Sequence, residues 1–191
     1  MHELVFATNN SHKIAEASAI LGNHFHLISL KDIGCLEELP EDKPTIKENA
    51  LQKARYIYER FGCDCFADDT GLIVDSLDGA PGVYSARYAG EDCNSQNNIR
   101  KLLENLNDKK DRRAQFKTVL ALIHNGDEYF FEGVVKGVIM TEIHGKGGFG
   151  YDPVFRPDGY ELSFAEMDSE LKNKISHRAL AIKALSFFLN A

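Results

Sequence analysis

Residues 113–140 read RAQFKTVLALIHNGDEYFFEGVVKGVIM, and they predict the main structural feature of the chain. Its two halves, Arg113 to Ile123 and Glu128 to Met140, are long runs of the kind found in strands. Between them lies HNGD, and its Asn-Gly pair is a strong signal for a tight hairpin turn. The sequence therefore predicts a long β-hairpin.

Elements of both kinds flank this hairpin, so a mixed α/β fold is expected. Thr45-Ile46-Lys47-Glu48 matches a capping box, and an apolar helical stripe follows it. Ser176 is a candidate N-cap for the last helix. The predicted strands outside the hairpin are 4–7, 25–30, 65–67 and 72–74, and the predicted helices span about 11–21, 46–60, 95–106 and 178–189.

The composition is that of a folded protein. The chain has 191 residues, 43% of them hydrophobic, which allows a sizeable core in one domain or a two-lobed fold. The start, MHEL, is not a basic leader, and no apolar run approaches the ~18 residues of a membrane span. A cytoplasmic location without membrane partners is expected. The four cysteines lack CxxC spacing, which favours reduced thiols over a disulfide frame or a zinc site.

The formal charge of −7 limits the partners. Neutralising a nucleic-acid backbone takes a basic surface, so nucleic acid is not expected as a partner. A small anionic ligand still fits, because the field in a cleft depends on nearby groups more than on total charge.

The first candidate site is Thr8 to Lys13, TNNSHK. A strand feeding a helix start offers free backbone N–H groups and a positive dipole end to phosphate, and Lys13 adds a mobile cation. Asn and Ser are also ordinary helix caps, so plain capping is the alternative. The GxxxxGK[ST] spacing of a P-loop is absent.

The second candidate is the adjacent pair Asp68-Asp69, followed by Thr70-Gly71. In extended backbone successive side chains face opposite ways, so only one carboxylate need enter a cleft. That one is suited to bind a divalent metal or to take a proton from water, and the other to hold the loop through backbone hydrogen bonds. A purely structural turn is the alternative.

Two further candidates lie late in the chain. GKGGFG at 145–150 formally contains GxGxxG, but Pro153 disfavours the helix that a dinucleotide fingerprint must open. A loop whose aromatic rings and nearby carboxylate suit a purine base is the other interpretation. The basic segment 172–178, KNKISHR, offers hydrogen-bond donors to an oxygen-rich ligand, or is simply a solvated helix entry.

Five segments in order closely resemble the inosine/xanthosine triphosphate pyrophosphatase family, over nearly the whole chain. They are TNNSHK at 8–13, ADDTGL at 67–72, GAPGVYSARYAG at 79–90, GKGGFGYDPVF at 145–155 and SHRALA at 176–181. The resemblance implies a single domain over residues 1–191 with a mixed sheet, a long hairpin and two lobes around a central cleft. It also implies a homodimer and Mg²⁺-dependent hydrolysis of ITP, dITP or XTP to monophosphate and pyrophosphate.

The resemblance also implies roles for individual residues. Asp69 resembles the general base and, with Glu41, a metal ligand, although the acidic loop around Glu41 offers several alternatives. Arg178, which can only donate hydrogen bonds, is expected to read the purine C6 oxygen with help from Lys172 or His177. The implied substrate contacts are Thr8, Asn9, Asn10, Lys13, Lys53, Thr70, Phe149, Gly150, Tyr151, Asp152, Lys172, His177 and Arg178.

Two rival functions stay open at this point. The first is a pyrophosphatase of similar fold that acts on other modified nucleotides. The second is a nucleotide-binding sensor without turnover, which the presence of Asp69, Lys13 and Lys53 disfavours.

Overall fold

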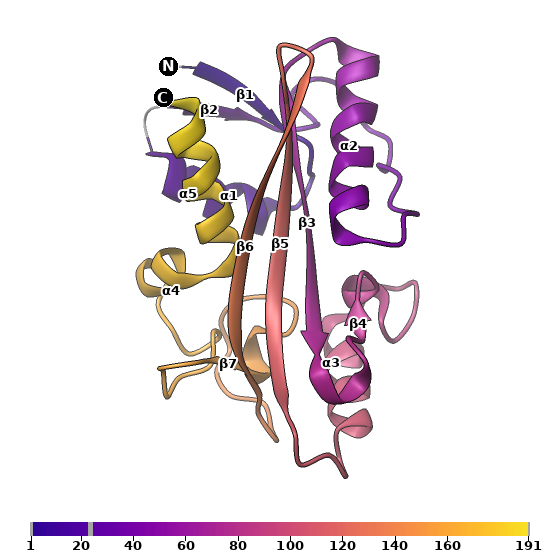
Figure 1. The fold of residues 1–191 in the computed structure, drawn as a ribbon, viewed down its shortest axis with the longest axis vertical. Coiled ribbons are helices and arrows are strands. Elements are labelled where there is room, and N and C mark those ends of the chain that lie inside the picture. Colours follow the sequence, from indigo (N-terminus) through magenta and orange to yellow (C-terminus); the bar gives the residue numbers. More distant parts are fainter. Residues whose placement is uncertain (1, 23–24, 191) are drawn as a thin grey trace. The chain divides into compact units, whose positions relative to one another are not determined.

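The computed structural model describes residues 2–22 and 25–190, which form a mixed α/β fold (Figure 1). The strand order is β2-β1-β3-β5-β6-β7, and β4 pairs with β3. The strands are β1 His2–Phe6, β2 Phe25–Ile28, β3 Cys65–Val74, β4 Pro81–Gly82, β5 Arg113–His124, β6 Asp127–Ile139 and β7 Phe155–Pro157. The helices are α1 Ser11–Leu21, α2 Ile46–Phe61, α3 Ser95–Asn105, α4 Ser169–Ile175 and α5 His177–Leu189. None of the described helices is long and apolar enough to cross a membrane.

The chain divides into two compact units. The first comprises Met1–Asp69, Thr118–Gly133 and His177–Ala191, and the second comprises Thr70–Lys117 and Val134–Ser176. Strands β3, β5 and β6 contribute residues to both units. The boundary on β3 falls between Asp69 and Thr70.

In the first unit helices cover both faces of the strands (Figure 1). β1 pairs in parallel with β2 and with β3, and α1 and α2 supply the crossovers that parallel strands need. Alternate residues of β3 face opposite sides: Phe66 packs in the cluster with α1 and α5, whereas the Cys65 thiol meets the Ala54 carbonyl of α2 at 3.3 Å. Asp68 and Asp69, which follow on β3, therefore also point to opposite faces of the strand.

The second unit has its own apolar core. Leu72 and Val74 of β3 pack with α3 through Ile99 and Leu102. Phe116, Phe155 and Phe164 form a cluster of rings beside them, with centroids 4.7 to 6.1 Å apart. Tyr151 and Val154, which follow the glycine-rich segment that begins at Gly145, belong to this core.

The hairpin prediction is confirmed. β5 and β6 are joined by Asn125 and Gly126, whose φ values of 53° and 88° are those of the tight turn that Asn-Gly favours. The capping box at the start of α2 is confirmed as well: the Thr45 hydroxyl accepts from the Glu48 N–H at 3.2 Å, and the predicted stripe is buried.

One local prediction was wrong, and one helix was missed. The separate strands 65–67 and 72–74 are one strand, β3, which runs through Asp68 and Asp69 without a turn. The prediction followed the turn preference of Asp and Gly, but side chains on both faces of the strand bind the two carboxylates and allow them to be buried. Helix α4, capped by Asp168, was not predicted.

Candidate active site

Asp68 and Asp69 lie side by side on β3 but face different elements of the first unit. Asp68 is 1% exposed and binds side chains from α1 and α5, whereas Asp69 is 8% exposed and lies near α2. The extended backbone of β3 causes this division, because successive side chains point to opposite faces of a strand. The expected split of roles between the two carboxylates therefore has a structural basis.

Asp68 is the centre of a buried ion-pair cluster. Its Oδ1 accepts from Lys13 Nζ at 2.8 Å and its Oδ2 from Arg178 Nε at 3.3 Å. Burial alone would raise the pKa of Asp68, but Lys13 and Arg178 outweigh it and hold the pKa well below its ordinary value. Arg178, 2% exposed, also donates through Nη1 to Glu16 at 2.5 Å. Asp68 thus ties α1 and α5 to the strand.

This arrangement corrects the role expected for Asp68. We expected its carboxylate to hold a loop through backbone hydrogen bonds, but it lies in a strand and its described partners are the side chains of Lys13 and Arg178. Local sequence patterns could not show that Arg178 pairs with Asp68 and Glu16, since Arg178 and Glu16 lie 110 and 52 positions away from Asp68 in the chain.

Asp69 has a different environment. Its Oδ1 lies 3.9 Å from Lys53 Nζ, and its Oδ2 is buried without a hydrogen-bond partner among the described residues. Burial raises the pKa of Asp69 to about 6, and nearby Lys53 only partly opposes this. Lys53, 4% exposed, donates a hydrogen bond to Glu41, so two carboxylates share one buried ammonium group. Asp69 is therefore an under-coordinated acceptor in a charged site.

The carboxylates of Asp69 and Glu41 are suited to bind a divalent cation whose coordination shell is completed by substrate. Mg²⁺ in phosphate-processing sites commonly takes one or two carboxylates and fills its shell with water and phosphate oxygens. The Oδ2 atom of Asp69 is a buried acceptor that a cation could bind, and Glu41 is nearby because it pairs with Lys53, the lysine that also lies next to Asp69. Over residues 2–22 and 25–190, no group of three or more Asp, Glu, His or Cys side chains forms a complete metal cage.

The raised pKa of Asp69 predicts a pH-dependent stability of the metal-free protein. A folded pKa of about 6 against an ordinary 3.8 means that folding favours the protonated carboxyl. The stabilisation is complete below about pH 4 and is lost as the pH rises through 6. That difference in pKa corresponds to about 3 kcal/mol.

Urea unfolding in the presence of a chelator tests this. Asp69→Asn should be more stable than the wild type at pH 8, and its advantage should shrink by about 3 kcal/mol on going to pH 4. An advantage that is the same at both pH values would mean that Asp69 has an ordinary pKa.

The β1–α1 turn brings together most of the expected phosphate contacts. A hollow of about 270 Å³ in the first unit is lined by Thr8, Asn9, Lys13, Glu41 and Lys53 among its ten residues. Asn10 is the N-cap of α1: its side chain accepts from the His12 and Lys13 N–H groups at 3.0 and 3.2 Å. Its capping role is thus confirmed, while a direct contact to phosphate stays a prediction.

The glycine-rich segment of the second unit is built around Asp152. The Asp152 carboxylate accepts from the Phe149 N–H and from Lys172 Nζ, both at 2.8 Å. The same ammonium group lies 4.9 Å from the centre of the half-buried Phe149 ring. Gly148 must be glycine here, because a Cβ atom would come within 2.2 Å of Asp152 Oδ2. The segment opens no α-helix, as predicted, but Asp152 and Pro153 begin a single 3₁₀ turn, Asp152–Val154, so Pro153 does not keep Asp152 out of helical geometry altogether.

The remaining predicted contacts are placed as follows. Tyr151 is 4% exposed, belongs to the core of the second unit and donates its hydroxyl hydrogen to the Ser85 carbonyl at 2.8 Å. Gly150 follows Phe149 with a φ of 61°. Thr70 lies next to Asp69 on β3, in the second unit. His177 begins α5 in the first unit, where β6 comes so close that a Cβ on Gly133 would lie 1.9 Å from the His177 carbonyl oxygen.

Comparisons with known proteins agree with these features. A model of the Ham1 family matches residues 4–188. The chain is 54% identical over 190 residues to a dITP/XTP pyrophosphatase of Porphyromonas gingivalis, covering 99% of this chain and 98% of that protein. It is 50% identical over 189 residues to a dITP/XTP pyrophosphatase of Flavobacterium johnsoniae, covering 99% and 98%. The structure of a HAM1 protein from Coxiella burnetii matches with a TM-score of 0.92 at 39% identity, covering 100% and 99%.

Proposed function

The chain belongs to the Ham1 family, and on this premise we propose that it hydrolyses non-canonical purine nucleoside triphosphates such as ITP, dITP and XTP. The products are the nucleoside monophosphate and pyrophosphate. The reaction is a hydrolysis of an acid anhydride, as in the relatives named dITP/XTP pyrophosphatase.

The observation that carries the proposal is the state of Asp69. Its Oδ2 atom is a buried acceptor without a donor among the described residues, next to Lys53 and Glu41. A carboxylate whose pKa is raised to about 6 is a better base than an ordinary aspartate and is still ionised at neutral pH. Asp69 therefore orients the attacking water and takes a proton from it.

The triphosphate binds to the hollow at the β1–α1 turn. Lys13 and Lys53 neutralise the leaving pyrophosphate. Each lysine is held in place by an ion pair, Lys13 with Asp68 and Lys53 with Glu41. Thr8 and Asn9, which line this hollow, supply hydrogen bonds to phosphate oxygens. Catalysis of this kind depends on positioning and charge stabilisation and needs no nucleophilic side chain.

Glu41 and Asp69 are the proposed ligands of Mg²⁺. When bound, the ion polarises the phosphate oxygens and stabilises the negative charge that develops on them. Lys53, which contacts both carboxylates, keeps them from repelling each other when the ion is absent.

The purine base binds to the second unit. The half-buried Phe149 ring is an aromatic surface suited to stack on a base, and Lys172 beside it is suited to donate to the C6 oxygen of hypoxanthine or xanthine. Adenine carries an amino group at C6, which is itself a donor and cannot accept a hydrogen bond from Lys172. Gly150, Tyr151 and Asp152 shape this segment, and direct contacts of Thr70, His177 and Arg178 with the nucleotide stay predictions.

A panel of nucleoside triphosphates tests the proposal. With Mg²⁺, ITP, dITP and XTP should be cleaved with a higher kcat/KM than ATP, and a chelator should stop the reaction. The non-catalytic sensor is the second candidate function, and binding of dITP without turnover over many protein equivalents would establish it. Preference for a modified pyrimidine would instead favour the rival of similar fold.

Lys172→Met tests base selection. The substitution removes a charged donor, whose hydrogen bonds are worth about 1.5–3 kcal/mol, so the ratio of kcat/KM for ITP over ATP should fall by about tenfold or more. Lys174→Met is the matched control, since Lys174 lies on the same helix, is 64% exposed and pairs with Glu170. A ratio that is unchanged in Lys172→Met would remove Lys172 from base recognition.

Two further properties belong to the proposal. We expect a homodimer, as the family resemblance implies, and a cytoplasmic location, where the nucleotide substrates of the proposed reaction would be found. Sedimentation of the purified chain checks the first, and fractionation of cells checks the second.

A further inference from the structure

We propose that Asn49 and Gln52 of α2 are positioning residues for the carboxylate of Glu41. They act through the two residues that follow Glu41 in the chain: Gln52 binds the backbone and side chain of Asp42, and Asn49 binds the backbone of Lys43. The inference rests on the proposed function, in which Glu41 is a metal ligand. It assigns a task to two polar side chains that look like ordinary residues of a solvated helix.

Three consecutive loop residues are each held by a different residue of α2. Lys53 donates to the Glu41 carboxylate. Gln52 binds Asp42 twice: its Oε1 accepts from the Asp42 N–H at 3.3 Å, and its Nε2 donates to Asp42 Oδ1 at 2.9 Å. Asn49 Oδ1 accepts from the Lys43 N–H at 2.8 Å.

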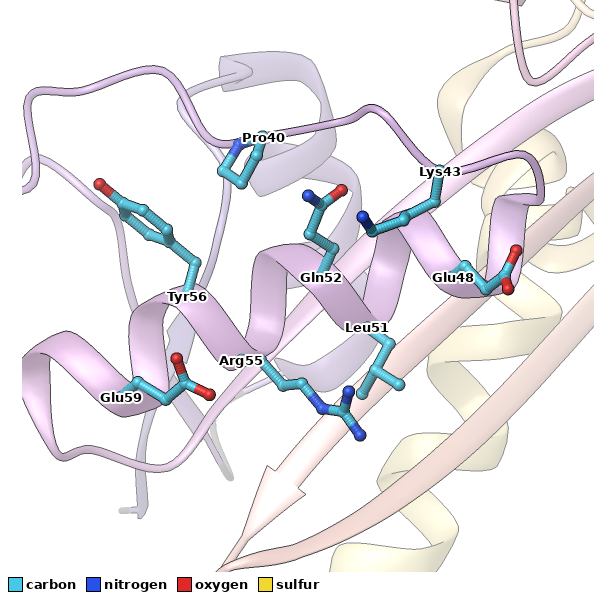
Figure 2. A pocket seen from close by; sticks show the side chains of 8 residues that line it. All are labelled: Pro40, Lys43, Glu48, Leu51, Gln52, Arg55, Tyr56 and Glu59. Carbon is cyan, nitrogen blue, oxygen red and sulfur yellow. The ribbon is translucent and has the colours of Figure 1, made fainter.

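The loop needs these contacts because it has no regular structure. Residues 35–45 lie in neither a helix nor a strand, so no ladder of backbone hydrogen bonds fixes the position of Glu41. Figure 2 shows the segment carrying Pro40 and Lys43 running along α2, with the Gln52 side chain pointing toward it and Arg55 pointing away. Side chains of the helix therefore replace the missing backbone contacts.

Of the two residues, Asn49 contributes more to fixing the loop. It is 1% exposed on a helix whose other buried positions include Ile46, Ala50 and Ala54, so a polar side chain there is costly unless it is hydrogen-bonded. Asn49 lies one helical turn before Lys53 on α2, and its Oδ1 atom obtains a hydrogen bond from the Lys43 N–H. Asp42 is exposed and Gln52 is only half-buried, so the hydrogen bonds of this pair contribute less.

A fixed Glu41 matters because metal affinity depends on ligands that are already in position. Residues that orient a ligand without touching the metal typically change metal affinity by about 10- to 100-fold when they are replaced. Loss of Asn49 should therefore weaken metal binding without altering the part of the site at the β1–α1 turn.

The test measures binding of Mn²⁺ to the full chain by electron paramagnetic resonance of the free ion. Asn49→Leu should raise the Kd of the Mn²⁺ site that Glu41→Gln removes by about tenfold, and Gln52→Leu should raise it less. Asp42→Asn combined with Gln52→Glu exchanges the amide and the carboxylate, keeps the charge and should restore the wild-type Kd. Arg55→Ala is the matched control and should leave the Kd unchanged. Arg55 lines a separate hollow along α2 together with Lys43 and Gln52, but it binds Glu128.

A second measurement separates positioning from general damage. Binding of a non-hydrolysable dITP analogue in the presence of a chelator should be nearly the same in Asn49→Leu and the wild type. Equal weakening of Mn²⁺ and analogue binding, or wild-type Mn²⁺ binding by Asn49→Leu, overturns the proposal. If Glu41→Gln itself leaves Mn²⁺ binding intact, the metal assignment has failed and the positioning role falls with it, whereas a failure confined to Asn49 and Gln52 leaves the proposed function standing.

Discussion

Asp69→Asn is expected to lower kcat for dITP by about 10²-fold or more, while KM changes little and the protein stays folded. The amide keeps the size of the side chain but cannot take a proton from water and binds a cation poorly. Because the charged carboxylate is unfavourable at its buried position, the same substitution should leave stability at pH 8 undiminished. Steady-state kinetics with dITP, together with urea unfolding, checks both parts.

Asp68→Asn is the matched comparison, one residue away on the same strand. It weakens the hold on Lys13 and Arg178, so it should raise KM and lower the free energy of unfolding. Near-normal kcat in a well-folded Asp69→Asn protein would show that Asp69 is not the base. Identical kinetic and stability profiles for the two variants would show that the carboxylates do not have separate roles.

Arg178→Ala is expected to lower the free energy of unfolding by about 3–5 kcal/mol at pH 8. The substitution removes the cation that Asp68 and Glu16 share in a buried site, and leaves Lys13 as the described cation bound to Asp68. Urea unfolding monitored by circular dichroism measures the loss.

Arg60→Ala controls for the removal of a guanidinium group. Arg60 is 55% exposed and pairs with the equally exposed Glu37, so its loss should cost less than about 1 kcal/mol. A loss below about 1 kcal/mol for Arg178→Ala as well would mean that the buried cluster does not hold α5 to the strand. Because of the expected instability, Arg178 is a poor choice for testing base selection, and Lys172 is the better one.

Local sequence patterns predicted the parts of the fold that local physics determines. The Asn-Gly turn and the capping box at Thr45 depend on side chains within a few residues of one another, and both are present. β3 was misjudged for the opposite reason. Asp-Asp-Thr-Gly favours a turn locally, but partners from distant segments, such as Lys13 and Lys53, make a straight strand possible.

The candidate site followed the same rule. The sequence singled out Asp69, Lys13 and Lys53, and the structure places them in the first unit. Asn49 and Glu16 escaped detection, because a single polar residue on a helix carries no pattern of its own. Their partners, Lys43 and Arg178, become neighbours only when the chain folds.

The most direct test of the central claim is hydrolysis of dITP in water enriched in ¹⁸O, with the products analysed by phosphorus NMR. Attack of water on the α phosphorus should give dIMP carrying the label and unlabelled pyrophosphate. Label in the pyrophosphate would mean attack on the β phosphorus. Orthophosphate and dIDP as the primary products would contradict the account altogether.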